Sequence, residues 1–266
     1  MSATVVLRLI ARRVGLLLLA GVVAVAIWIV FLQAFNITEL IGQRPWQVWT
    51  YLFSAPDSAQ HRAELLGHLL ITARDSLVGY AVGLSVAFLL ALIFSLSATL
   101  ERIFMPTSMV LRSVPLIILT PLVTLIFGVN LGGVSAIVTL VVFLPSLANI
   151  LFGLRGANVQ YRDLIGAYGG GRIVALVKVG IPSAVPALFA SARIALPAAV
   201  TGAMIAEWLA TGEGLGGSIA RASGQFGYDE MWASAVVITA ATMLAYSVIS
   251  VIDTVVVTRF GALSAS

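Results

Sequence analysis

Long apolar runs separated by short polar segments dominate this chain. Six of them are long enough to cross a bilayer as helices, which takes about 20 residues each. These runs cover residues 14–35, 65–97, 109–127, 134–154, 183–209 and 231–258. They do not alternate between apolar and polar positions, which favours helices over barrel strands. The pattern predicts an all-α integral membrane protein with six transmembrane helices.

The basic residues indicate how these helices are oriented. One set of loops and ends is rich in arginine, and the loops on the other side are balanced or slightly acidic. The basic set contains Arg8, Arg12, Arg13, Arg102, Arg155, Arg162, Arg172, Lys178 and Arg259, against only Glu101 and Asp163. Because basic loops stay in the cytoplasm, we expect both termini to be cytoplasmic.

Composition excludes several classes of function. The chain is 60% hydrophobic and 10% charged, too apolar to cover a soluble domain of 266 residues. Its net charge of +4 comes from single arginines in loops, so it indicates no nucleic-acid partner. The absence of cysteine excludes disulfides and thiolate chemistry. His61 and His68 flank one span and are interpreted as interfacial residues, so no catalytic, cofactor or metal site is predicted.

Small residues recur along the second run. Gly79, Gly83, Ala87 and Ala91 repeat at every fourth position and form one stripe on a helix. Such a stripe lets helix backbones approach closely. We expect it to pack within the chain, with a dimer interface as the alternative.

A cytoplasmic segment at 158–186 is too long for a simple turn. Tyr161, Leu164, Ile165 and Tyr168 follow i, i+3, i+4, i+7 spacing, which predicts a short amphipathic helix. The glycines at 169–171 should end this helix, and the chain should then return to the membrane and stop at Ile181-Pro182. The apolar face suits either a lipid surface or a groove on a cytoplasmic partner.

The spacing of this segment resembles the EAA loop of binding-protein-dependent ABC importer permeases. Asp163 is followed by Gly169 and then by the Val179-x-Ile181-Pro182 pattern at the distances typical of that family. Asp163 stands in place of the family's glutamate, and Leu164-Ile165 in place of its alanines. The glycine and the proline are in register.

Other segments are similar to the nitrate/sulfonate/taurine branch of this family. The similarity extends from about Leu65 to Phe260. Its motifs are Leu111-Arg-Ser-Val-Pro115, Pro121-Leu, Phe127-Gly128, Ile181-Pro-Ser-Ala-Val-Pro186, Ala192-Arg-Ile-Ala-Leu196, Ala206-Glu-Trp208, Gly214-Leu-Gly216 and Met231-Trp-Ala233.

The resemblance implies a permease of the type I importer fold in the cell inner membrane, which carries a small anion or polar organic solute. Its expected partners are a second copy of the chain, a cytoplasmic ATPase dimer and an extracytoplasmic substrate-binding protein. No cofactor is expected in this chain, since ATP and Mg would bind the ATPase. Residues 1–62 would form the N-terminal span and external loop, and 63–260 the permease core, with a coupling loop at 155–182. The implied coupling residues are Tyr161, Asp163, Leu164, Ile165, Tyr168, Gly169, Gly171, Arg172 and Pro182.

Two glycine patterns bear on the energy source. The stretch 212–217 satisfies GxGxxG, but it follows a membrane span rather than a strand, so we interpret it as a tight external turn. No GxxxxGK[ST] motif occurs, so the chain is not its own ATPase and not an enzyme.

Charged residues and prolines within the spans are candidates for the translocation path. Charges at membrane depth are costly and mark functional hypotheses, while prolines interrupt helices that line cavities. The candidates are Arg112, Pro115, Arg193, Pro197 and Glu207. For Arg193 a structural ion pair is the alternative. At the level of the whole protein, the alternatives are an ion-coupled secondary transporter and a membrane scaffold without transport.

Overall fold

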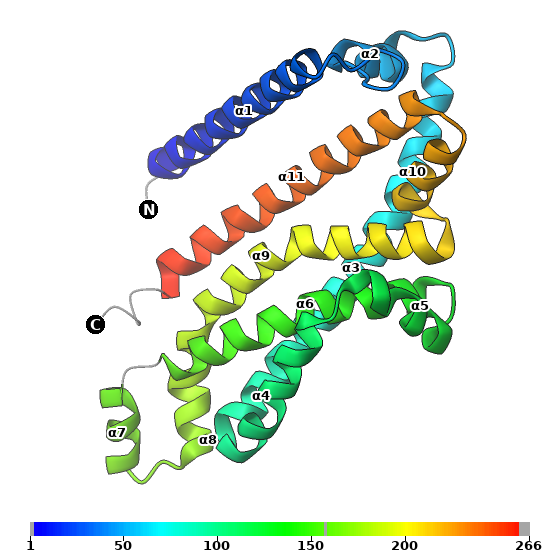
Figure 1. Cartoon of the computed structure of the whole chain (residues 1–266). Helices are drawn as coiled ribbons and strands as arrows, with labels where there is room; N and C mark the ends of the chain where they lie inside the picture. Colours follow the sequence, from blue (N-terminus) through cyan, green and yellow to red (C-terminus); the bar gives the residue numbers. More distant parts are fainter. Residues whose placement is uncertain (1–2, 157–158, 261–266) are drawn as a thin grey trace. The chain divides into compact units, whose positions relative to one another are not determined.

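The computed structural model describes residues 3–156 and 159–260, and these fold almost entirely into helices (Figure 1). The α-helices are α1 (Ala3–Ala34), α2 (Pro45–Trp49), α3 (Ser58–Leu96), α4 (Ala98–Ser113), α5 (Leu116–Phe127), α6 (Leu131–Arg155), α7 (Val159–Ala167), α8 (Arg172–Ala175), α9 (Ile181–Ala206), α10 (Gly214–Gly224) and α11 (Tyr228–Phe260). The described residues also contain three π-helical turns, which are η1 (Thr50–Ser54), η2 (Leu176–Gly180) and η3 (Glu207–Thr211). The predicted all-α class is confirmed.

Within the described part of the chain, four helices are long and apolar enough to span a membrane. They are Ser58–Leu96, Leu131–Arg155, Arg172–Thr211 and Tyr228–Val257. The bent pair α4–α5 brings the number to five if it counts as one span. In α1 the apolar stretch with described side chains, Leu19–Ala34, is shorter than a span. The sixth span and the side of the termini therefore stay predictions.

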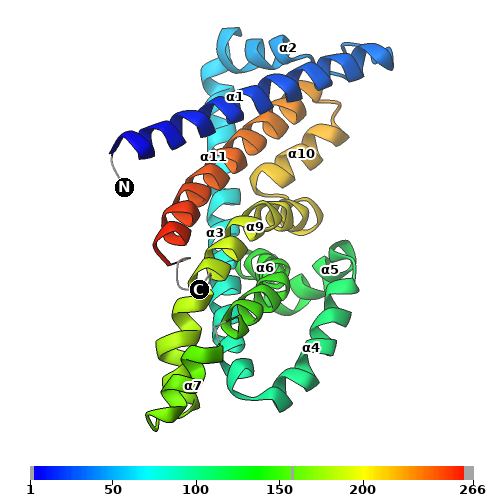
Figure 2. The ribbon, with the colours of Figure 1, turned by 90° about the vertical axis from the view of Figure 1, so that its left-hand side faces the viewer.

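The third predicted span, 109–127, is wrong as a continuous helix. Helices α4 and α5 meet at a bend of 107° (Figure 2). Pro115 causes the break, because its ring disfavours the helical conformation at the preceding residue. Val114 accordingly has extended backbone angles, φ −75° and ψ 124°. The helix continues through Pro121, which lies inside α5.

The fifth predicted span, 183–209, begins too late. A helix runs from Arg172 to Thr211, and the expected stop at Ile181-Pro182 is wrong. The π-turn η2 precedes this proline, and in it the Ile181 N–H bonds the carbonyl of Leu176, five residues back. Pro182 then lies in the first turn of α9, where a missing N–H costs least.

The chain divides into two compact units. The first contains the described residues up to Glu64 together with Ala222–Ala233. The second contains Leu65–Arg221 and the described residues from Ser234 onward. The predicted division at 62/63 stays a prediction.

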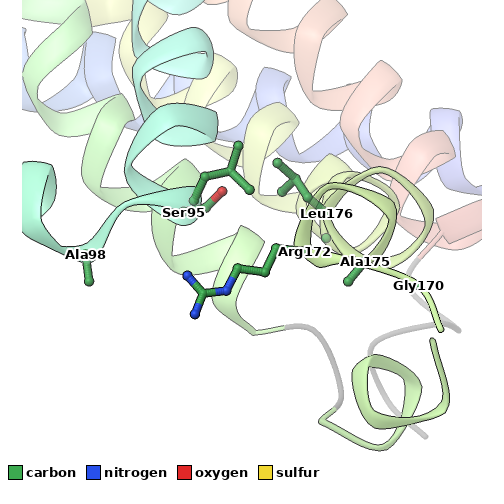
Figure 3. Close-up of a pocket in the computed structure, with 9 residues that line it drawn as sticks. Ser95, Ala98, Gly170, Arg172, Ala175 and Leu176 are labelled. Atoms are coloured by element: carbon green, nitrogen blue, oxygen red, sulfur yellow. The ribbon is translucent and has the colours of Figure 1, made fainter. Parts of the chain in front are cut away.

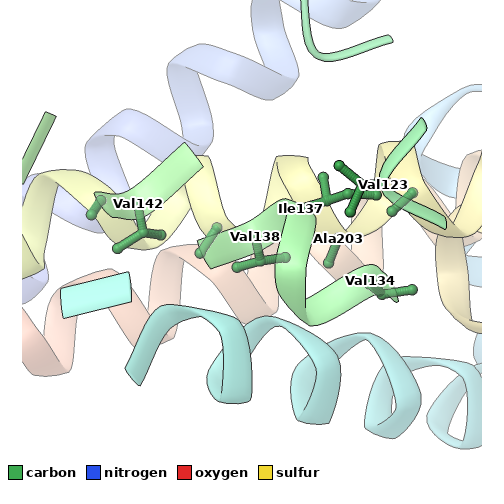
Figure 4. Close-up of a cluster of buried hydrophobic side chains, with 9 residues drawn as sticks. Val123, Val134, Ile137, Val138, Val142 and Ala203 are labelled. Atoms are coloured by element: carbon green, nitrogen blue, oxygen red, sulfur yellow. The ribbon is translucent and has the colours of Figure 1, made fainter. Parts of the chain in front are cut away.

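Helix α6 forms the centre of the second unit. One face carries Val134, Ile137, Val138 and Val142, all fully buried (Figure 4). Helix α9 meets this face with buried alanines spaced three or four residues apart. These are Ala195, Ala199, Ala203 and Ala206. Small residues let the two backbones approach, and dispersion contacts then replace contacts with lipid.

The stripe on α3 packs against the same central helix. A Cβ at Gly79 would overlap Val138 and lie 2.6 Å from the carbonyl oxygen of Ser135. A Cβ at Gly83 would lie 2.9 Å from the Cβ of Val142. The expected packing within the chain is therefore confirmed.

Candidate functional site

The cytoplasmic loop predicted from the sequence contains a short helix that ends at glycine. Helix α7 stops in a Schellman motif, in which the Gly170 N–H bonds the Ile165 carbonyl at 2.8 Å and the Gly169 N–H bonds the Gly166 carbonyl at 3.0 Å. Gly169 has a φ of +77°, the left-handed conformation that glycine adopts most readily. The helix end predicted at the glycines 169–171 is confirmed.

The apolar face predicted for α7 is largely uncovered by its own chain. Tyr168 is 86% exposed, Leu164 and Tyr161 are also exposed, and Ile165 is half-buried. Asp163 is exposed as well. Five of the basic residues that the sequence assigns to the cytoplasmic side lie outside the described side chains. They are Arg8, Arg12, Arg13, Arg162 and Arg259. An exposed apolar face on a loop helix is typical of a contact surface.

Replacing Gly169 with alanine is expected to destabilise the end of α7 by about 1 kcal/mol, because alanine resists a positive φ. Gly166→Ala is the matched control, since Gly166 lies inside the same helix with open space around it and an ordinary φ. Amide hydrogen exchange should show faster exchange at 165–170 in Gly169→Ala and unchanged or slower exchange in Gly166→Ala. Equal exchange in both variants would contradict the Schellman assignment.

A cavity of about 390 Å³ lies between the α7–α8 loop and the turn that joins α3 to α4 (Figure 3). Arg172 extends from the start of α8 into this space, opposite Ser95 and Ala98. Gly171 lines the cavity and is the N-cap residue of α8. Three of the predicted loop residues, Gly171, Arg172 and Pro182, thus lie on the chain that leads from the cavity into α9.

An ion pair ties two cytoplasmic segments of the sequence prediction together. Arg155, at the end of α6, donates two hydrogen bonds to the carboxylate of Glu101 in the first turn of α4. The sequence assigned both segments to the same side of the membrane, and the ion pair agrees with that assignment.

Helices α9 and α11 line two open cavities in the membrane-spanning part of the second unit. One, of about 540 Å³, is lined by Arg193 and Asp253, whose Nη1 and Oδ2 atoms lie 2.9 Å apart. The other, of about 490 Å³, is lined by Pro197 and by the side chains of Thr201, Thr242 and others. Arg193 therefore forms the ion pair that the sequence analysis gave as the alternative, and it also lines a cavity.

Arg193 and Asp253 each keep hydrogen-bonding capacity beyond this contact. Among the described atoms, Arg193 Nε and Asp253 Oδ1 are buried without a partner. The carboxylate is 7% exposed and the arginine side chain 32% exposed. A charge pair in this position is costly to desolvate and requires its partner.

Glu207 lies in a buried network at the other end of the same long helix. Its Oε2 accepts hydrogen bonds from the Thr72 hydroxyl at 2.8 Å and from the Gly216 N–H at 2.9 Å. Thr72 in turn accepts from the Leu215 N–H. The carboxylate thus occupies the N-terminal end of α10, where a negative charge is stabilised by the helix dipole. Thr72 carries no sequence signal for this role, since it lies 135 positions away.

The glycines of the GxGxxG stretch fit around this carboxylate. Gly212 and Gly214 have φ values of +67° and +64°. A Cβ at Gly214 would overlap the Glu207 carboxylate, and one at Gly217 would overlap the backbone of Gly212. The interpretation as a tight turn agrees with this geometry, because the stretch follows a helix rather than a strand.

Glu207→Gln is expected to destabilise the folded chain by about 1–2 kcal/mol. The amide keeps an acceptor for Thr72 and Gly216, but it loses the charge at the helix end and buries an NH₂ group where Oε1 has no described partner. Thermal unfolding of the purified chain in detergent measures the loss. The exposed Glu213→Gln, on the adjacent turn, should leave stability unchanged, and an equal loss there would argue against the network.

The last two path candidates lie at the bend. Arg112 is in the last turn of α4, where a positive charge complements the helix dipole, and Pro115 is the N-cap residue of α5. Arg193 and Pro197 lie one turn apart on α9, and each lines one of the two cavities. Glu207, in contrast, is completely buried. Their roles in transport stay predictions.

The sequence also matches a known family. Residues 79–261 match the binding-protein-dependent transport system inner membrane component family. The chain belongs to this family. It is a multi-pass protein of the inner membrane and a permease subunit of an ABC importer, and the alternatives of a secondary transporter and a scaffold are wrong.

Relatives and a solved structure agree with this assignment. A Haemophilus influenzae protein named as an ABC transporter permease is 26% identical over 82% of the permease and 89% of its own length. The formylaminopyrimidine transport permease of Halalkalibacterium halodurans is 29% identical, over 71% of this chain and 75% of the relative's length. A Bacillus subtilis protein named for aliphatic sulfonates transport is 27% identical, over 58% of this chain and 55% of the relative's length. This relative is consistent with the predicted nitrate/sulfonate/taurine branch.

The fold of the permease is similar to a chain of the MetNI methionine ABC transporter in an inward-facing conformation. The TM-score is 0.57 at 21% identity, and the match covers 77% of the permease and 99% of that chain. This likeness shows the type I importer permease fold.

Proposed function

We propose that the permease works as a homodimer, driven by a cytoplasmic ATPase dimer that binds the exposed face of α7. The observation that carries this proposal is the geometry of the loop: an apolar helix face left open by its own chain and ended by Gly169. Such a face suits a hydrophobic groove on a partner. ATP and Mg bind the partner, and no cofactor is held by this chain.

Arg172 and Pro182 connect this face to the membrane. Helix continuity from Arg172 to Thr211 supports rigid transmission, because a displacement of the loop moves a helix that reaches across the bilayer. ATP binding closes the ATPase dimer and favours one permease state, and hydrolysis restores the other. Coupling then equals the difference in ATPase affinity between the two states.

The solute is a small anion or a small polar organic molecule delivered by an extracytoplasmic binding protein. The names of relatives, which include formylaminopyrimidine and sulfonate permeases, support this class. We propose six spans with both termini in the cytoplasm, with α1 as the first span and α4–α5 as the third. Arg112, Pro115, Arg193, Pro197 and Glu207 remain the proposed residues of the path or its gate.

Co-purification of the ATPase with permease variants tests the proposal. Tyr168→Asp places a charge on the α7 face and should abolish ATPase binding and solute uptake together, while the permease still inserts in the membrane. Phe226→Ala is the matched control, because Phe226 is 76% exposed and lies on a loop assigned to the opposite side. Normal ATPase binding by Tyr168→Asp would overturn the coupling role of α7.

A further inference from the structure

The segment between α1 and α3 carries an unusual aromatic surface. Helix α2 and the turn η1 together cover Pro45–Ser54. Trp46, Trp49 and Phe53 follow i, i+3, i+7 spacing on this helix and are 50%, 62% and 51% exposed. Val48 and Leu52 are buried and hold the helix to its own unit. The aromatic side chains therefore form a stripe that the unit itself does not cover.

Polar side chains flank the stripe on the same helix. Thr50 lies one turn after Trp46 and donates its hydroxyl to the Trp46 carbonyl at 3.0 Å, whereas the exposed Ser54 follows Phe53 and lies to the side of the stripe. The rings of Trp49 and Phe53 pack 4.4 Å apart. The guanidinium of Arg44 lies 5.4 Å from the ring centre of Trp46. Aromatic rings with arginine beside them are typical of the membrane–water interface.

The linker before α2 packs against the end of α1. Gly42 packs so closely on the last turns of α1 that a Cβ there would be 2.6 Å from Cδ2 of Leu32. Trp232 stacks on Trp28 of α1 and donates its Nε1–H to the carbonyl of Ile41 at 2.9 Å. These contacts fix the linker against α1 within one unit. With α1 as the proposed first span, α2 therefore begins close to the membrane surface.

The exposed apolar surface continues from α1 into this linker. Phe35, Leu40 and Ile41 are all exposed, as is Phe31 in the last turns of α1. Water disfavours an apolar surface of this extent, whereas the headgroup region accepts it. Its continuity with a predicted span favours lipid over a soluble protein as the occupant.

We propose that Trp46, Trp49 and Phe53 insert into the bilayer interface beside the end of α1. Helix α2–η1 is then an interfacial anchor that sets the depth of the loop between the first two spans. The occupant is lipid at the boundary between headgroups and acyl chains. The inference does not depend on ATPase coupling. It uses the proposed function only for the orientation of the chain, which places this loop at the outer leaflet.

The absence of cysteine makes a direct test possible. The full chain is reconstituted in phosphatidylcholine–phosphatidylglycerol liposomes with one spin label, in the variants Trp49→Cys and Phe53→Cys. Ser54→Cys is the control on the same helix, and Gln60→Cys is an exposed polar control at the start of α3 in the same unit. Labels at 49 and 53 should collide with oxygen more than with a water-soluble nickel chelate, and labels at 54 and 60 should show the reverse.

Equal nickel accessibility at all four positions would overturn the proposal. So would labels at 49 and 53 that are accessible to nickel and become shielded only after a substrate-binding protein is added, because the stripe would then be a protein-docking surface. A second measurement covers variants that fail to assemble. Brominated lipid should quench the tryptophan fluorescence of the unlabelled chain, and Trp46→Phe/Trp49→Phe should lower the quenchable fraction; an unchanged fraction also contradicts insertion.

Discussion

Replacing Arg193 with methionine is expected to destabilise the permease by about 3–5 kcal/mol, the cost of leaving a buried charge without its partner. Asp253 is only 7% exposed, so its carboxylate has little access to water once the guanidinium is gone. The reverse change, Asp253→Leu, should cost less, because the arginine side chain is 32% exposed and flexible enough to move its charge toward water.

The double variant Arg193→Met/Asp253→Leu separates charge pairing from packing. It should recover most of the stability, since an apolar pair of similar volume avoids the desolvation cost of both ions. Thermal unfolding of all four proteins in one detergent forms a double-mutant cycle. Additive losses would show that the two residues do not depend on each other. Uptake by the double variant then decides the role in transport: a stable protein that does not transport supports Arg193 as a path residue.

Enlarging Gly79 is the second change with a large expected effect. Gly79→Leu should cost about 3 kcal/mol, because its side chain has no room between α3 and Val138 of α6. Even Gly79→Ala should be destabilising, since the added Cβ would lie 2.6 Å from the carbonyl oxygen of Ser135 and backbone cannot move aside cheaply.

Gly67 supplies the control on the same helix. No neighbour lies within 4 Å of a Cβ at that position. Gly67→Ala should therefore leave stability unchanged or raise it by up to about 1 kcal/mol through helix propensity. Thermal unfolding of the three variants measures the contrast. A similar loss for Gly67→Ala and Gly79→Ala would mean that α3 does not pack on α6 through its glycines.

Several features followed from local pattern because their causes are local. Apolar runs of membrane length require internally hydrogen-bonded helices wherever they occur in a bilayer. The end of α7 was predictable because Gly169 directly follows the apolar positions of the helix, and glycine readily adopts the positive φ that ends a helix. The stripe at Gly79 and Gly83 was recognisable because small residues four positions apart lie on one helix face.

The predicted bounds of the third and fifth spans failed because a proline can either break a helix or lie within it. Pro115 breaks the chain into helices at 107°, whereas the helix continues through Pro182 and Pro186. The residues alone do not separate these cases, because the outcome depends on whether neighbouring groups satisfy the freed carbonyls. At Pro182 a π-turn shifts the hydrogen bonds, and at Pro115 the chain turns instead.

The sequence by itself determined the membrane class, the all-α class, the loop helix with its glycine stop and the family. Each rests on residues close together in the chain or on fixed spacing. Tertiary structure alone decided that Arg193 meets Asp253 and that Glu207 caps α10 with the help of Thr72. Arg193 and Asp253 are 60 positions apart in the sequence, and Thr72 and Glu207 are 135 apart. Many polar residues could satisfy a buried charge, but few are brought within hydrogen-bonding distance of it. The packing of α3, α9, α10 and α11 is what selects these partners.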